Sequence, residues 1–144
     1  MKSSINISIL AVLASLFPIN AYTMDYSFST GGGFQYGGLI GAQGSAYEDA
    51  HRFRAAIGLI GIGIGYDYLL SENLSIGITG GGMVPFKDAK LLSLNYFFSG
   101  NYKEGWQIGL DIGKVSIANC IIFCPDGTDY SNTDILFLSG GYTF

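Results

Sequence analysis

Residues 106–115 alternate between large apolar side chains and small or polar ones. The even positions hold tryptophan, isoleucine, leucine and isoleucine, whereas glutamine, glycine and aspartate stand between them. Successive side chains of a β-strand point to opposite faces, so this period of two predicts a strand with one apolar face. Residues 60–70, 74–84 and 91–100 alternate in the same way. The chain is therefore expected to be all-β.

The face opposite the apolar one is unlike the exterior of a water-soluble sheet. Only 12% of the 144 residues are charged, whereas a soluble domain carries about 25%. The second face holds mainly glycine, serine and asparagine, which suits the crowded interior of a narrow barrel. Strands that cross a membrane must pair every backbone group, which only a closed barrel achieves. We therefore expect a closed, antiparallel, up-and-down transmembrane β-barrel rather than a soluble sandwich.

The N-terminal segment has the composition of a secretory signal. It carries one charge, at Lys2, followed by an apolar run at positions 5–17 and a small residue at Ala21. This run is shorter than the ~20 residues that a membrane-spanning helix needs. Residues 1–21 are predicted to be a cleaved signal peptide, and residues 22–144 to be the barrel.

The connections between strands suggest an orientation. Segments 71–73 and 101–105 are short and polar, whereas 84–90 and 117–133 are longer. Outer-membrane barrels keep short turns in the periplasm and longer loops outside. Both termini are then periplasmic, as an even number of strands requires.

The number of strands is open between eight and six. Segments 26–46 and 52–70 are each about twice the ~9 to 11 residues that cross a bilayer. If both fold back, the barrel has eight strands; if neither does, it has six long ones. Eight is the smallest usual number, glycines at 36–39 suit a tight reversal, and the apolar parity switches near 58–61. We favour eight strands.

Aromatic residues support this orientation independently. Tyrosine and tryptophan gather where a membrane meets water. An aromatic girdle is predicted at the periplasmic ends of four strands, formed by Tyr66, Tyr68, Tyr96, Phe98, Trp106, Tyr142 and Phe144.

The last strand ends on Tyr142, Thr143 and Phe144. With its signal peptide, alternating strands and aromatic ending, the chain resembles the small outer-membrane β-barrel proteins of Gram-negative bacteria, the OmpA/OmpX-like class. The resemblance implies an outer-membrane location, contact with outer-membrane lipids and insertion by the barrel-assembly machinery through the C-terminal strand. It implies no activity.

Three charged residues have inward parity: Arg54, Asp67 and Asp111. Charges removed from water need partners, so we expect a polar network inside the barrel. Because side chains just fill an eight-stranded interior, structural filling is favoured over an ion path.

The sequence shows no catalytic constellation. His51 is the only histidine, and no nucleophile and orienting acid accompany it in a recognisable motif. We interpret it as a polar residue in a connecting turn, with a lipid-modifying enzyme as the alternative. Neither a cofactor, a metal nor a nucleic acid is expected to bind.

The longest predicted loop contains Cys120 and Cys124. In an exported protein two cysteines favour a disulfide, with free or intermolecular thiols as the alternative. The residues between them, Ile121, Ile122 and Phe123, form an apolar tip suited to a surface partner, whose identity is unknown, or to lipid. The expected function is therefore a non-catalytic structural or surface-interaction role in the cell envelope, with a lipid-modifying enzyme or a minimal pore as alternatives.

Overall fold

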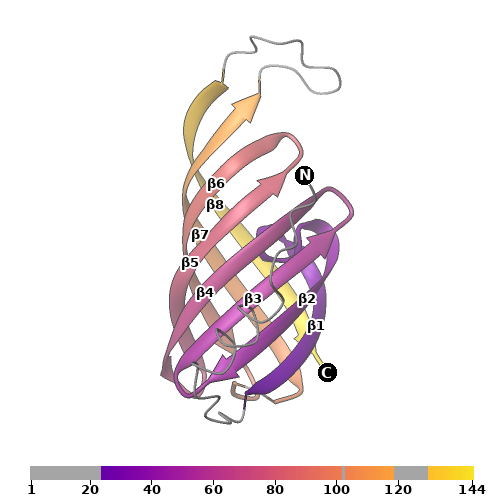
Figure 1. Cartoon of the computed structure of the whole chain (residues 1–144), viewed down its shortest axis with the longest axis vertical. Helices are drawn as coiled ribbons and strands as arrows, with labels where there is room; N and C mark the ends of the chain where they lie inside the picture. The colour runs from indigo at the N-terminus through magenta and orange to yellow at the C-terminus, as the bar shows by residue number, and fades with distance from the viewer. Residues whose placement is uncertain (1–23, 102, 119–129) are drawn as a thin grey trace, which may run out of the picture.

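Eight antiparallel strands form a closed barrel in the computed structural model, which describes residues 24–101, 103–118 and 130–144 (Figure 1). Each strand pairs with its neighbours in sequence, and the first pairs with the last. The prediction of eight strands is confirmed, and the six-strand alternative is wrong. The predicted signal peptide lies outside the described residues. The strands are β1 (Asp25–Gly33), β2 (Gly38–Glu48), β3 (His51–Gly58), β4 (Gly61–Ser71), β5 (Leu74–Met83), β6 (Phe86–Phe97), β7 (Gly105–Ala118) and β8 (Tyr130–Thr143).

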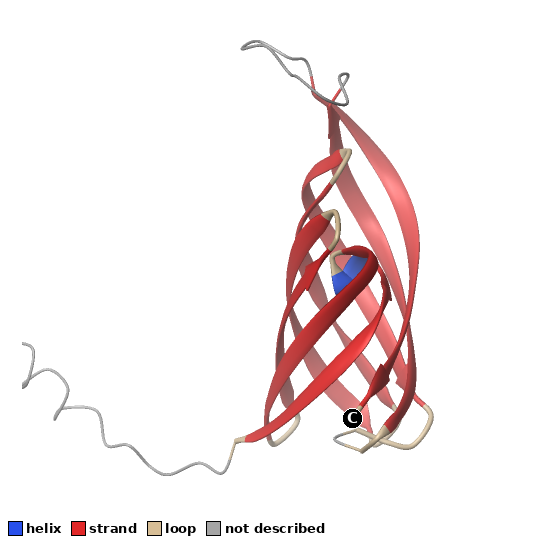
Figure 2. Cartoon of the chain, turned by 90° about the vertical axis from the view of Figure 1, so that its right-hand side faces the viewer, coloured by secondary structure: helices blue, strands red, loops and turns tan. Residues whose placement is uncertain are grey.

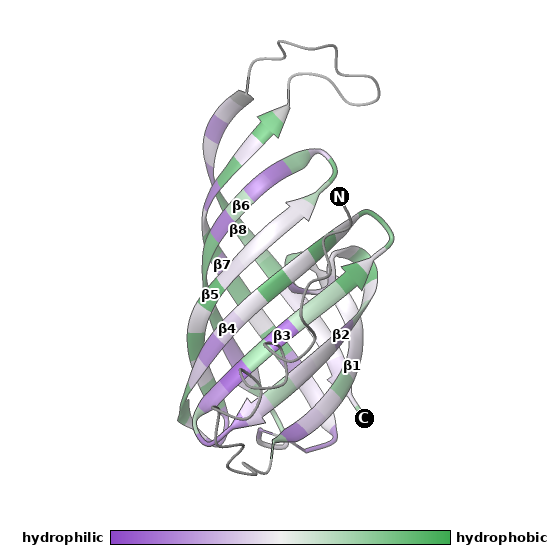
Figure 3. Cartoon of the chain, in the orientation of Figure 1, coloured by the Kyte–Doolittle hydropathy of each residue, from purple (hydrophilic) through white to green (hydrophobic). Residues whose placement is uncertain are grey.

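The distribution of side chains is inverted relative to a soluble protein. Large apolar residues face outward, so Leu138 is 74% exposed and Ile64 is 68% exposed. Polar residues face inward, and both Asp67 and Asp111 are 0% exposed. The alternation is visible as changing hydropathy along each ribbon (Figure 3). An apolar exterior around a polar interior is typical of membrane barrels.

Tight connections define the two ends of the barrel. Asp49–Ala50 join β2 to β3 and Glu72–Asn73 join β4 to β5, at the end where the chain terminates; we call this the terminal end. The opposite end is called the far end. There, Leu59–Ile60 join β3 to β4. This two-residue turn lies at the predicted parity switch and accounts for it.

The prediction of a long loop at 84–90 is wrong. Only Val84 and Pro85 connect β5 to β6, and the following residues already belong to β6. The register shifts between Lys87 and Lys90, and Asp88 has a φ of 51°. Such a bulge inserts an extra residue and interrupts the alternation, which made this part of the strand resemble a loop.

The predicted loop at 117–133 is also too long. β7 and β8 remain paired as far as Ala118 and Tyr130, so only 119–129 connect them, and these lie outside the described residues. The far rim is consequently oblique, because β7 and β8 extend beyond β1 to β4 (Figure 1). Outward residues on the tall side are polar, for example Lys114 and Asn132, whereas Leu39 and Leu59 are exposed on the short side.

The connection between β1 and β2 turns into the barrel. Phe34–Tyr36 form a short 3-10 turn, here called the inward turn (Figure 2), and all of its residues are buried. Gly37 and Gly38 follow with φ of 72° and 125°, a conformation that favours glycine. The reversal predicted at 36–39 therefore uses these glycines, but it begins at Phe34, and Leu39 is part of β2.

Candidate functional site

Asp67 is the centre of one cluster in the barrel interior. Its carboxylate accepts hydrogen bonds from Arg52 Nε at 2.8 Å, Arg54 Nε at 2.9 Å and Asn95 Nδ2 at 3.1 Å. The side chains of both arginines are almost completely buried, at 1% and 2% exposed. One buried carboxylate thus holds two guanidinium groups, contributed by the neighbouring strand β3.

Asp111 is the centre of a second cluster, on β7. Ser93 Oγ donates to its Oδ1 at 2.5 Å, and Gln35 Nε2 donates to the same oxygen at 3.0 Å. Thr79 connects the two clusters, because it contacts Arg54 as well as Ser93. The positive charges of the two arginines equal the negative charges of the two aspartates, and charge-assisted hydrogen bonds connect these buried groups.

The inward turn supplies part of this network. Gln35 reaches Asp111 as described, and the Tyr36 hydroxyl accepts a hydrogen bond of 2.6 Å from Gln107 Nε2. Phe34 points toward the far end, where it stacks on Phe137 with ring centroids 5.1 Å apart. The far half of the interior is apolar, and a buried cluster there comprises Phe34, Ala89, Leu91 and Val115.

The inward turn also closes the seam between the first and last strands. The register of β1 with β8 contains four residue pairs and stops at Gly32 opposite Gly140. From that point the chain continues along the inner face of β8. Phe34 stacks on Phe137, the Gln35 amide donates to Ser139 Oγ at 3.3 Å, and the Tyr36 ring lies against Gly141. Glycine is favoured at 141, because a Cβ there would lie 2.2 Å from the Tyr36 hydroxyl oxygen and 2.6 Å from the backbone oxygen of Thr30.

The predicted interior charges lie together in the structure. Arg54 and Asp67 are bonded directly, and Asp111 joins them through Thr79 and Ser93. Sequence reasoning missed Arg52, although it has the same parity as Arg54 two residues away. It also missed Gln35 and Tyr36, because their burial depends on a turn into the lumen that leaves no periodic signal.

His51 lies on the outer face of the terminal end, as the first residue of β3. Its Nδ1 is 2.6 Å from the Tyr66 hydroxyl, and its ring meets Tyr68 edge-on at 5.5 Å. The ring of His51 thus contacts two tyrosines, and Glu48 lies opposite His51 in the β2–β3 register. His51 therefore lies among the aromatic residues of the terminal end.

The residues of the predicted girdle lie at the terminal end. Trp106 packs edge-on against Tyr142, which in turn packs against Phe144, and Tyr96 packs against Phe98. Tyr66 and Tyr68 surround His51 on the neighbouring wall. Cys120, Cys124 and the tip Ile121, Ile122 and Phe123 lie outside the described residues.

In the part of the chain that the structure describes, no helix has the length and hydropathy to cross a membrane. No protein-family model matches the chain, and comparison with the curated proteins and with the solved structures finds no match.

Proposed function

We propose that this chain is a small barrel of the Gram-negative outer membrane, with a non-catalytic structural or surface-interaction role in the cell envelope. The observation that carries the proposal is the distribution of side chains across the barrel wall, with apolar residues outside and a charge-balanced polar network inside. Such an exterior is costly in water and favourable in lipid. The OmpA/OmpX-like architecture and the aromatic ending support the same location and insertion by the barrel-assembly machinery.

The length of the apolar band fits a bilayer. On β7, Trp106 begins the band and Lys114 is the first outward charge, eight residues later. That distance is about 27 Å along a strand at ~3.4 Å per residue. A strand tilt of ~35–45° reduces it to about 20 Å, near the ~25 Å of outer-membrane barrels. The terminal end is then periplasmic, and the tall β7–β8 side reaches outward with the Ile121–Phe123 tip as a surface contact.

A structural role fits the interior better than a pore or an enzyme does. The described lumen is filled by the inward turn and by both clusters, including fully buried Arg52 and Asp67. In the proposed orientation His51 lies at the periplasmic rim, away from the outer leaflet in which a lipid-modifying enzyme of the cell surface would work. These features support closure and an absence of turnover.

Fractionation and heat modifiability test the membrane barrel. The protein is expected in the outer-membrane fraction, and an unboiled detergent sample should migrate differently from a boiled one. Deleting Phe144 should leave chains in the periplasm, because the deletion removes the aromatic end of the closing strand. A soluble wild-type protein with one mobility would refute the proposal, whereas normal membrane levels of the deletion variant would refute only the role of Phe144.

Lipid analysis tests the absence of turnover. Cells that produce the wild-type protein, the His51→Ala variant or no protein should show the same lipopolysaccharide acylation pattern by mass spectrometry. The reason is that the His51 ring is held in the aromatic rim of the terminal end by its contacts with Tyr66 and Tyr68. A change in acylation that requires the wild-type protein and disappears with His51→Ala would make the barrel an enzyme.

A further inference from the structure

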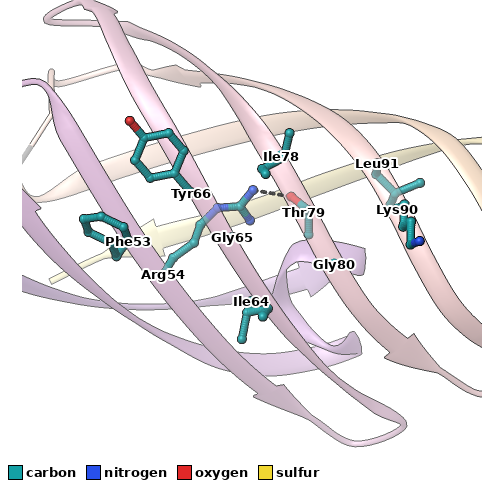
Figure 4. Close-up of a pocket in the computed structure, with 10 residues that line it drawn as sticks. All are labelled: Phe53, Arg54, Ile64, Gly65, Tyr66, Ile78, Thr79, Gly80, Lys90 and Leu91. Atoms are coloured by element: carbon teal, nitrogen blue, oxygen red, sulfur yellow. Dashed lines mark hydrogen bonds between the residues drawn. The ribbon is translucent and has the colours of Figure 1, made fainter.

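An apolar groove of about 730 Å³ crosses the outer wall over β4 and β5 (Figure 4). Phe53, Tyr66, Ile64 and Ile78 surround it with outward side chains, and the backbone at Gly80 forms part of its floor. Lys90 lies at its edge on β6. The groove thus combines an apolar channel with one exposed cationic group, because Arg54, which also lines it, is buried.

Gly80, which lines the groove, helps to keep it open. Gly80 and Gly82 alternate outward on β5 beyond Ile78, so this part of the wall has no side chains. A Cβ at Gly80 would meet only Ala89 O at 3.6 Å, and one at Gly82 only Phe86 O at 3.6 Å, both ordinary contacts. Gly81 differs, because its φ is 152° and a Cβ added there would lie 2.3 Å from Ile62 O. The fold therefore requires glycine at 81 but not at 80 or 82.

A pair of lysines stands beside this open strip. Gly80 lies opposite Lys90, which lies opposite Lys114 in the β6–β7 register. Like charges directly opposite one another destabilise a sheet. Both lysines are exposed, and Lys114 also lies opposite the exposed Asp134 in the β7–β8 register. Asp134 offsets the charge on the Lys114 side only, because Lys90 lies between Gly80 and Lys114; an anion that contacts both ammonium groups would relieve the remaining repulsion.

The lysines stand where the apolar band ends. Two residues closer to the terminal end on each strand, Ile78, Leu92 and Ile112 form a cross-strand row of apolar residues. Lys90 on β6 is eight residues from Phe98, which directly follows that strand, and the same spacing separates Lys114 from Trp106 on β7. In the proposed orientation, both ammonium groups therefore lie at the depth of lipid headgroups, with the groove beside them in the acyl region.

We propose that this groove binds one lipid that carries a phosphate monoester, with an acyl chain over Gly80 against Ile64 and the phosphate between Lys90 and Lys114. The inference rests on the proposed function, because it requires the barrel to lie in a membrane. A phosphate monoester carries nearly two charges near neutral pH and three acceptor oxygens, which match two ammonium groups. A zwitterionic headgroup offers no such match.

Native mass spectrometry of the folded protein in detergent tests the site with phosphatidic acid and phosphatidylcholine of identical acyl chains. The wild-type protein should retain one phosphatidic acid in preference to phosphatidylcholine. Each lysine near a headgroup is worth roughly fivefold in affinity. The Lys90→Ala/Lys114→Ala double variant should therefore bind phosphatidic acid on the order of 25-fold more weakly.

A second pair of variants tests the groove itself. Gly80→Leu should weaken phosphatidic acid binding, because the new side chain occupies the position of the acyl chain. Gly44→Leu is the matched control, since it fills a smaller outward groove, of about 350 Å³, whose lining contains no lysine. Nothing lies within 4 Å of a Cβ at Gly44, so this variant should fold and bind as the wild type does.

The remaining outcomes separate the two proposals. Heat modifiability is measured for every variant. A heat-modifiable wild-type protein that binds both lipids equally, or a Gly80→Leu variant that binds phosphatidic acid normally, would overturn the lipid site and leave the proposed function intact. Displacement of the lipid by inorganic phosphate at equal concentration would also overturn it, because the groove would then contribute nothing. A wild-type protein that is not heat-modifiable would overturn the proposed function and this site with it.

Discussion

Replacing Asp67 by asparagine is expected to lower the free energy of unfolding by roughly 3 to 5 kcal/mol. The wild-type carboxylate holds Arg52 and Arg54 with Nε to oxygen distances of 2.8 and 2.9 Å, and it is 0% exposed. Asparagine retains the size of the side chain but leaves two buried cations with one remaining aspartate in the network. Urea unfolding in detergent, followed by fluorescence of the single tryptophan, Trp106, measures the change.

The matched control for Asp67 is Asp25→Asn. Asp25 is exposed at the start of β1, so the same chemical change there should alter stability by no more than about 0.5 kcal/mol. Equal losses in the two variants would mean that removal of a negative charge, rather than loss of the buried pairing, causes the effect. A loss below about 1 kcal/mol at Asp67 would contradict a tightly coupled interior, because a buried unpaired charge costs more.

Replacing Phe34 by alanine should cost roughly 3 to 5 kcal/mol, the range for a large aromatic side chain removed from a packed core. Phe34 is 1% exposed and stacks on Phe137 within the apolar cluster of the far half. Its loss should also free the rest of the inward turn. The Gln35 amide, which bonds Ser139 Oγ, should then exchange its hydrogen faster in an NMR measurement.

Phe34→Leu distinguishes packing from aromatic identity. Leucine keeps most of the apolar volume, so the cost should stay below about 1.5 kcal/mol and the Gln35 amide should remain protected. If alanine and leucine destabilise the barrel equally, the stacking on Phe137 matters more than the filled volume. If neither variant changes exchange at Gln35, the inward turn is held by its polar contacts alone.

Much of the barrel could be predicted from parity, because lipid and lumen impose opposite demands on alternate residues. β7 shows this most clearly, with tryptophan, isoleucine and leucine outward and Gln107, Gly109 and Asp111 inward. The predicted ends of the strands were wrong where a local feature interrupted the alternation of apolar and polar residues. The bulge around Asp88 removed the alternation from the start of β6, and the polar outward residues of the tall β7–β8 side resembled a loop although they remain paired.

The candidate site could be predicted only in part, for a related reason. Parity places Arg54, Asp67 and Asp111 inside, but it does not say which of them meet. The contact between Gln35 and Asp111 joins residues 76 positions apart through a turn that leaves the sheet altogether. No period describes such a turn. Burial of Phe34 was equally hidden, since its even position continues the outward series of Tyr26 and Phe28.

The short seam between β1 and β8 has a consequence for the order of assembly. Its four register pairs are continued by the inward turn, whose residues meet β8 at Phe137, Ser139 and Gly141. These contacts cannot form before β8 arrives. Closure of the ring and docking of the inward turn on β8 are therefore a single event, and the seam is completed only when the last strand pairs with the first.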